Sequence, residues 1–167
     1  LWRSRTNADH IAGTEWYPKA RRIVTEWASH YGYSIDTVAC VIAAISPQCD
    51  WERNLIIAED ILADRPPSIG GIRSNVDKAI ALRNEERPEL GIMGVSFESI
   101  SDRMLRRFPG GPKVNNFAHN LAGYDHYVTI DNHAAQAAMN TPSVSYGLPW
   151  LPYGEFAKAY VSVASML

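Results

Sequence analysis

The chain has 167 residues, of which 46% are hydrophobic and 20% are charged, and its formal net charge is −2. This composition fits one globular domain. The chain lacks the large excess of positive charge that many nucleic-acid-binding proteins have, so any DNA contact must come from local patches. The two cysteines are too few for the four thiolates of an iron–sulfur cluster, and the five histidines lack zinc-ligand spacing, so no metal and no other cofactor is expected.

The first third of the chain predicts two helices. Residues 1–13 are weakly patterned and predict a loop or a short helix, whereas an apolar side predicts a helix from about Thr14 to Tyr31. Ser34 is the expected N-cap of a second helix over 35–46. That helix is apolar almost all round, which is typical of the buried centre of an α-helical domain, and it includes Cys40 as an expected core residue.

The next segment predicts two further helices separated by a loop. Asp50 is the expected N-cap of an amphipathic helix over 51–63. Its expected inward residues are Leu55, Ile56, Ala58, Ile61 and Leu62. Residues 64–73 contain prolines and glycines and predict a loop, and Ser74 is the expected cap of a helix over 75–84. Residues 85–96 predict irregular structure.

A glycine turn between two helices follows. Apolar spacing predicts a helix over 97–108, and Pro109, Gly110 and Gly111 then interrupt it. Pro112 suits the first turn of a new helix over 113–121, where its missing N–H would have no helical partner. The free amides of such a turn can bind an anion such as a phosphate. An ordinary αα-turn without a ligand is the alternative.

The last part of the chain contains a short β-prone run and two more expected helices. Residues 127–130 are too few for a helix, and Asp131 follows as the expected N-cap of a helix over 132–139. Asp131 can serve only as a cap, or also as a fixed anionic group beside a pocket. A proline-rich loop over 141–152 precedes a final helix over 153–166. These elements predict one all-α domain over residues 1–167, with a helical core at about 34–140 and terminal helices that pack together.

Four motifs resemble the helix-hairpin-helix DNA glycosylases, the superfamily of endonuclease III, with this chain as a divergent, phage-type member. The family's hairpin with its lysine resembles Phe108-Pro109-Gly110-Gly111-Pro112-Lys113, and its Val-Asp-x-His motif resembles Ile130-Asp131-Asn132-His133. Two weaker matches are Ile45-Ser46-Pro47-Gln48, which resembles a Leu-Ser-x-Gln turn, and the helix that includes Asn75–Leu82. The hairpin departs from the family pattern, because its glycines are adjacent and it is one residue shorter.

The resemblance implies a helical bundle with a cleft between two helical subdomains, and roles for particular residues. The implied catalytic residues are Asp131, whose carboxylate would stabilise positive charge on the sugar, and Lys113, whose amine would attack C1′. The implied DNA-binding residues are Gln48, Gly110, Gly111, Arg107 and Asn115, and Gln48 would fill the space left by the extruded base. The implied base-pocket residues are Asn116, Asn120, His133 and Trp51. For Trp51, a place in the core is the alternative, and for Gln48 the alternative is a solvated amide in a loop.

These expectations define three functions. The first is a DNA glycosylase that flips out a damaged or modified base and has lyase activity through Lys113. The second is an enzyme of the same fold that transfers groups onto modified pyrimidines of phage DNA, and the third is a non-catalytic DNA-binding module. We expect a monomer whose partner is DNA. Low cysteine use and the lack of a long apolar run predict no membrane segment and a cytoplasmic, nucleoid-associated place in a bacterium or a phage-infected host.

Overall fold

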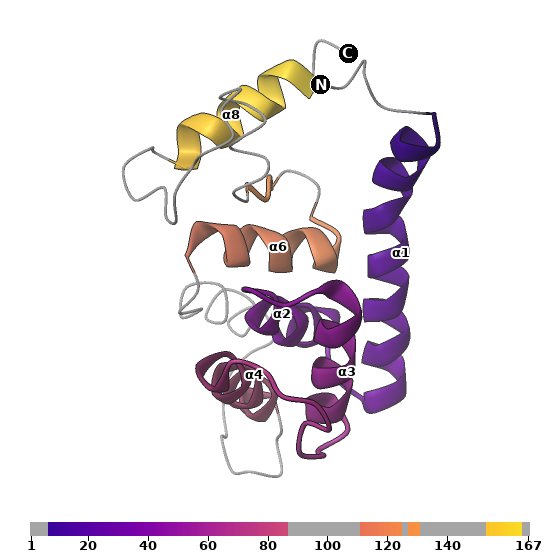
Figure 1. The fold of residues 1–167 in the computed structure, drawn as a ribbon, viewed down its shortest axis with the longest axis vertical. Helices are drawn as coiled ribbons and strands as arrows, with labels where there is room; N and C mark the ends of the chain where they lie inside the picture. The colour runs from indigo at the N-terminus through magenta and orange to yellow at the C-terminus, as the bar shows by residue number, and fades with distance from the viewer. Residues whose placement is uncertain (1–6, 87–110, 125–126, 131–152, 165–167) are drawn as a thin grey trace.

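The computed structural model describes residues 7–86, 111–124, 127–130 and 153–164, and all regular structure within these ranges is helical (Figure 1). The described helices are α1 (Asn7–Tyr31), α2 (Ile35–Ile45), α3 (Trp51–Leu62), α4 (Arg73–Glu85), α6 (Pro112–Ala122) and α8 (Tyr153–Ala164). The predicted all-α class is therefore confirmed for these ranges. The helices expected over 97–108 and 132–139, and the loop over 141–152, lie outside the described residues.

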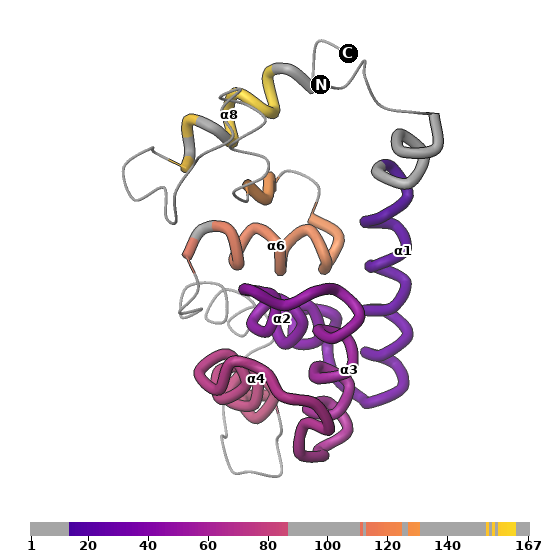
Figure 2. Tube along the Cα trace, viewed as in Figure 1, coloured from indigo at the N-terminus to yellow at the C-terminus, as the bar shows by residue number. Residues whose placement is uncertain are grey.

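Helix α2 is the centre of the core, as its apolar sequence predicts. Residues 37–45 are all buried, and α1, α3, α4 and α6 each pack against this helix, as the tube in Figure 2 traces. An amphipathic helix can bury only one side, whereas α2 has apolar residues on every side and can contact four neighbours. Cys40 is 2% exposed, and burial in this core raises the pKa of its thiol to about 12.

The N-caps of α2 and α3 are those that the sequence predicts. The Ser34 hydroxyl accepts a hydrogen bond from the Thr37 amide at 3.1 Å, and an Asp50 carboxylate oxygen accepts one from the Arg53 amide at 2.8 Å. Ser34 also ties α2 to the end of α4, because its amide and its hydroxyl each donate to the Glu86 carboxylate at 2.9 Å. This long-range contact fixes two chain segments that are 52 residues apart.

Three local predictions are wrong. Helix α1 begins at Asn7 and continues through Pro18, although a loop or only a short helix was expected before Thr14. Helix α4 begins at Arg73 with no side-chain cap, so Ser74 lies inside it, and its packing against α2 stabilises it instead. Ile56 is 44% exposed because the buried residues of α3 lie on the opposite face of the helix.

Two charged networks hold the turn that follows α3. One Asp60 carboxylate oxygen accepts from the amide and hydroxyl of Ser68 at 2.7 and 2.6 Å, and the other accepts from the Arg65 guanidinium. Arg83 of α4 is only 7% exposed and donates to the Asp64 carboxylate at 2.6 Å. Buried charges are tolerated when they are paired and hydrogen-bonded. The Asp60 network therefore holds the loop against α3, and the Arg83 network fixes α4 against the end of α3.

Helix α6 begins at the predicted glycine–proline junction. Gly111 is its N-cap and Pro112 occupies its first turn. It ends at Gly123, whose φ of 101° lies in the left-handed region that glycine adopts without steric cost. Val114 and Leu121 face the core and Phe117 is half-buried, which confirms the apolar face expected for this helix.

Candidate nucleoside pocket

A pocket of about 290 Å³ lies where α1, the end of α2, α6 and residues 127–130 meet. Its lining residues carry aromatic rings, hydroxyls and one amine, and they are Trp16, Tyr17, Ser46, Lys113, Phe117 and Thr129. The volume is near the lower end of the range for small-molecule sites, about 300–1,000 Å³. The pocket is therefore of a size for one base with its sugar.

Trp16 is the centre of the aromatic wall. Its ring centroid lies 6.0 Å from that of Phe117 with an interplanar angle of 30°, and 4.9 Å from those of Tyr17 and Trp51. The guanidinium of Arg21 lies 6.0 Å from the centre of the Tyr17 ring. These rings pack against one another, which fixes their orientation. They are therefore suited to stacking on a flat heteroaromatic base.

Lys113 occupies the first turn of α6 and is exposed on the pocket's rim. Among the residues that the structure describes, no side chain caps this helix, and no atom lies within 4 Å of the position of a Cβ atom at the exposed Gly111. The first-turn amides and the helix dipole favour an anion at this end, and the Lys113 amine adds a formal positive charge. The start of α6 therefore has the chemistry to bind a phosphate or another anion.

The segment 127–130, which carries Thr129, is held by side chains of two helices. Asn116 of α6 donates to the Val128 carbonyl at 2.7 Å, and the Tyr153 hydroxyl of α8 donates to the same carbonyl at 2.8 Å. The Tyr153 hydroxyl also accepts from the Ile130 amide at 2.8 Å, and Ile130 is 5% exposed. Thr129 is therefore fixed between two anchored residues as part of the pocket wall.

Asn120 holds the other end of this segment. With its amide nitrogen turned toward the carbonyls of Tyr124 and Tyr127, at 3.1 and 2.9 Å, its oxygen accepts from the Thr129 hydroxyl at 3.0 Å. The backbone carbonyl of Asn120 accepts from the Arg21 guanidinium at 2.8 Å, which joins α6 to α1. Asn120 is 6% exposed, so its amide supports the pocket wall from behind.

Asp36 forms a separate polar contact on α2. The Tyr124 hydroxyl hydrogen-bonds to its carboxyl group, and the imidazole of His119 is close enough to act on its charge. Burial raises the pKa of Asp36 above its ordinary value, because the ionised form loses hydration, and the His119 charge opposes this effect. The same carboxylate, followed by burial, raises the pKa of Tyr124. None of these groups lines the pocket with Lys113.

Gln48 lies in the turn between α2 and α3 and is exposed, with a φ of 57°. A residue with a side chain seldom adopts this left-handed conformation, and such strain is found at functional sites more often than elsewhere. Ser46, two residues earlier, lines the pocket with Lys113. A second hollow of about 510 Å³ lies on the other side of this turn, and both Gln48 and Arg53 line it.

The remaining predicted site residues have different surroundings. Trp51 is half-buried against the core and contacts Trp16, but it does not line the pocket. Asn116 lines a neighbouring hollow with Tyr127. The side-chain oxygen of Asn115 is buried and has no hydrogen-bond partner among the described residues. The predicted residues Gly110, Arg107, Asp131 and His133 lie outside the described part of the chain.

Sequence reasoning did not identify most of the aromatic and hydroxyl lining of the pocket. Trp16 and Tyr17 lie in the helix expected from Thr14 to Tyr31, but neither they nor Ser46 and Thr129 were assigned to a site. The adjacent rings of Trp16 and Tyr17 are a local signal, because a helix cannot bury both of them on one narrow apolar face. No local sequence pattern predicts that Trp16 and Tyr17 lie beside Thr129, which is over 110 positions away.

Among the described residues, no three His, Cys, Asp or Glu side chains are arranged to hold a metal ion. No helix in the described ranges has the length and apolar character needed to cross a membrane.

Comparison with protein-family models identifies a family for this chain. The model of a protein family, described as a family of unknown function (DUF7178), matches residues 1–167, which is the whole sequence. No curated protein and no solved structure matches the chain.

Proposed function

We propose that this chain, which belongs to the DUF7178 family, is a DNA glycosylase with lyase activity that binds a flipped nucleotide in the Lys113 pocket. The observation that carries the proposal is the lining of this pocket, where an amine, three aromatic rings and hydroxyl groups border a space of about 290 Å³. Aromatic rings stack on any base, and a cation at a helix N-terminus attracts the backbone phosphate.

The position of Thr129 supports a role for Asp131 at the same site. Thr129 borders the pocket together with Lys113, and Asp131 is two residues further along the chain. The intervening Ile130 is buried, and its amide is bonded to the Tyr153 hydroxyl. In the proposed reaction, the Asp131 carboxylate stabilises positive charge on the sugar as the bond between C1′ and the base breaks.

The proposed covalent step uses Lys113. The neutral amine attacks C1′, the base departs with the bonding electron pair, and the nitrogen gives one proton to the departing base. The bond between C1′ and O4′ then breaks, O4′ takes up the second proton of the nitrogen, and the C1′–N double bond of a Schiff base forms. At a site that has already lost its base, the amine instead condenses with the C1′ aldehyde and releases water. Borohydride reduces either Schiff base to a stable secondary amine that joins the protein to DNA.

The test is borohydride trapping with a duplex that contains one abasic site. We expect a covalent protein–DNA adduct from the native protein and none from Lys113→Ala, whereas Lys78→Ala is the matched control because Lys78 of α4 does not line the pocket. Duplexes with single damaged or modified bases then identify the base that is released. A folded protein that neither forms an adduct nor releases any base would contradict the proposal.

A non-catalytic DNA-binding module is the second candidate, and the exposure of Lys113 favours it. An exposed lysine in the first turn of a helix is suited to a phosphate contact without covalent chemistry, because the helix dipole favours an anion there. This candidate predicts no adduct, unchanged behaviour in Asp131→Asn, and an affinity for DNA that falls steeply as salt increases. Binding measured at several salt concentrations, together with the trapping experiment, separates the two functions.

A further inference from the structure

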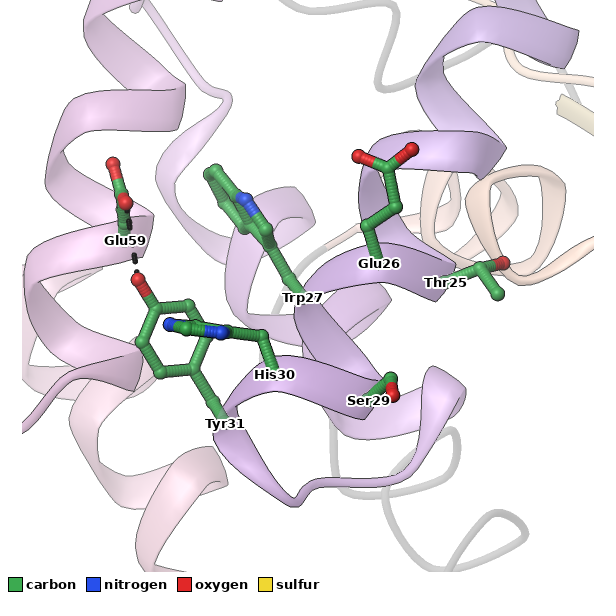
Figure 3. A pocket seen from close by; sticks show the side chains of 7 residues that line it. All are labelled: Thr25, Glu26, Trp27, Ser29, His30, Tyr31 and Glu59. Carbon is green, nitrogen blue, oxygen red and sulfur yellow. Dashed lines mark hydrogen bonds between the residues drawn. The ribbon is translucent and has the colours of Figure 1, made fainter.

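A further open groove lies at the other end of α1, away from the Lys113 pocket, where the last turns of α1 meet α3 (Figures 1 and 3). Its volume is about 660 Å³. The lining residues are polar, acidic or aromatic, and they are Thr25, Glu26, Trp27, Ser29, His30, Tyr31 and Glu59. None of them lines the Lys113 pocket, so an inference about this groove does not depend on the proposed function.

The groove is acidic. Its lining includes two glutamates and no lysine or arginine. Glu26 forms no ion pair among the residues that the structure describes. The nearby Arg65 is already bound to Asp60 at 3.0 Å, although its charge still acts on Tyr31. A cation that enters the groove would therefore meet carboxylate groups without displacing an existing ion pair.

The two carboxylates flank an aromatic ring. In the view of Figure 3, the indole of Trp27 lies between the side chains of Glu59 and Glu26, and all three line the groove. Trp27 is half-buried against the core, which fixes its ring. The Tyr31 hydroxyl donates to one oxygen of Glu59 at 3.0 Å, so this carboxylate is also held in place. Within the described part of the chain, no hydrogen bond occupies its second oxygen.

We infer that the groove binds the guanidinium group of an arginine side chain in a basic segment of a partner protein. A guanidinium is planar, so it can stack on the indole of Trp27 while its edges donate hydrogen bonds to carboxylates. The compact ammonium group of lysine carries the same charge but cannot match this flat arrangement of a ring between two acids. His30, whose ring packs edge-on against Tyr31 at 4.6 Å, closes one side of the groove.

The experiment follows the indole N–H signals of the full chain by NMR while blocked arginine, N-acetyl-arginine amide, is added. The Trp27 signal is assigned with Trp27→Phe, which keeps an aromatic ring at this position. We expect a saturable shift of the Trp27 signal, an affinity about tenfold weaker for N-acetyl-lysine amide, and no saturable shift with the neutral citrulline analogue. Equal shifts from citrulline, or from lysine, would overturn the assignment to a guanidinium.

Two variants test the role of the acids without removing the ring. Glu59→Gln keeps an acceptor for the Tyr31 hydroxyl but loses the charge, and it should weaken arginine binding about tenfold. Glu15→Gln removes the same charge from α1 outside the groove, where Glu15 pairs with Lys19, and it should leave binding unchanged. Equal binding by the native protein and Glu59→Gln would overturn the proposal.

A final comparison identifies the source of the arginine. A blocked Gly-Arg-Gly peptide should bind at least as tightly as blocked arginine, because the groove is open and admits the flanking backbone. Tighter binding of free arginine, with its charged termini, would show a small-molecule site and overturn the assignment to a protein partner. If the protein instead forms a concentration-dependent oligomer and none of the arginine probes binds, the groove is a contact between two copies of this chain. That result would also overturn the proposal.

Discussion

At the scale of single residues, Asp60 shows how a buried carboxylate depends on its donors. It is 6% exposed, and its two oxygens accept from Ser68 and Arg65. These hydrogen bonds, those from Ser68 first, lower the pKa of Asp60 below its ordinary value of 3.8 because they stabilise the ionised form. The stabilisation is fully present above about pH 4 and is lost as the pH falls through the lowered pKa of the folded state.

This linkage gives a prediction for pH-dependent unfolding. Asp60→Asn should lower the free energy of unfolding at pH 7 by about 2 kcal/mol, because an amide cannot accept all the hydrogen bonds of the carboxylate. The difference from the native protein should shrink as the pH falls below 4. Urea unfolding at several pH values measures both effects. Asp77→Asn is the control, since Asp77 is 67% exposed and pairs loosely with Arg73 at 3.9 Å, and it should have almost no effect.

At the scale of elements, a tyrosine of α8 makes the backbone hydrogen bonds that a neighbouring β-strand would otherwise make. The Tyr153 hydroxyl bonds to the Val128 carbonyl and to the Ile130 amide, each at 2.8 Å, so one side chain satisfies two backbone groups of the segment 127–130. Buried backbone groups need such partners, and in a chain whose described structure is helical no adjacent strand provides them. The last helix therefore fixes a wall of the pocket that lies over 20 residues earlier in the sequence.

Removal of this hydroxyl should loosen the segment. We expect Tyr153→Phe to lower the free energy of unfolding by about 1–3 kcal/mol and to accelerate hydrogen exchange at the Ile130 amide, because that donor loses its partner. Tyr31→Phe is a matched control, because it removes a tyrosine hydrogen bond of 3.0 Å between α1 and α3. Unchanged exchange at Ile130 in Tyr153→Phe, or equal acceleration in both variants, would contradict this role.

At the scale of the whole molecule, the sequence predicts those features that neighbouring residues determine. The all-α class, the buried α2, the caps Ser34 and Asp50, and the start of α6 at Gly111 and Pro112 all follow from local patterns. The start of α4 and the hydrogen bonds between Ser34 and Glu86 cannot be predicted from local patterns, because both depend on packing between distant segments. The pocket follows the same rule: Lys113 was predicted from its motif, whereas its aromatic and hydroxyl lining comes from three other parts of the chain.

The buried thiol of Cys40 can serve as an internal reporter of global opening. At pH 8 an ordinary cysteine is partly thiolate and reacts with a disulfide reagent, but Cys40 is only 2% exposed in a helix that four others pack against, and burial raises its pKa to about 12. We expect Cys49, which is half-buried, to be labelled first, and Cys40 to be labelled only as fast as α2 becomes exposed. In Cys49→Ser, the labelling rate should therefore rise with urea in parallel with the unfolded fraction. Rapid labelling of Cys40 without urea would show that the centre of the domain opens independently of unfolding.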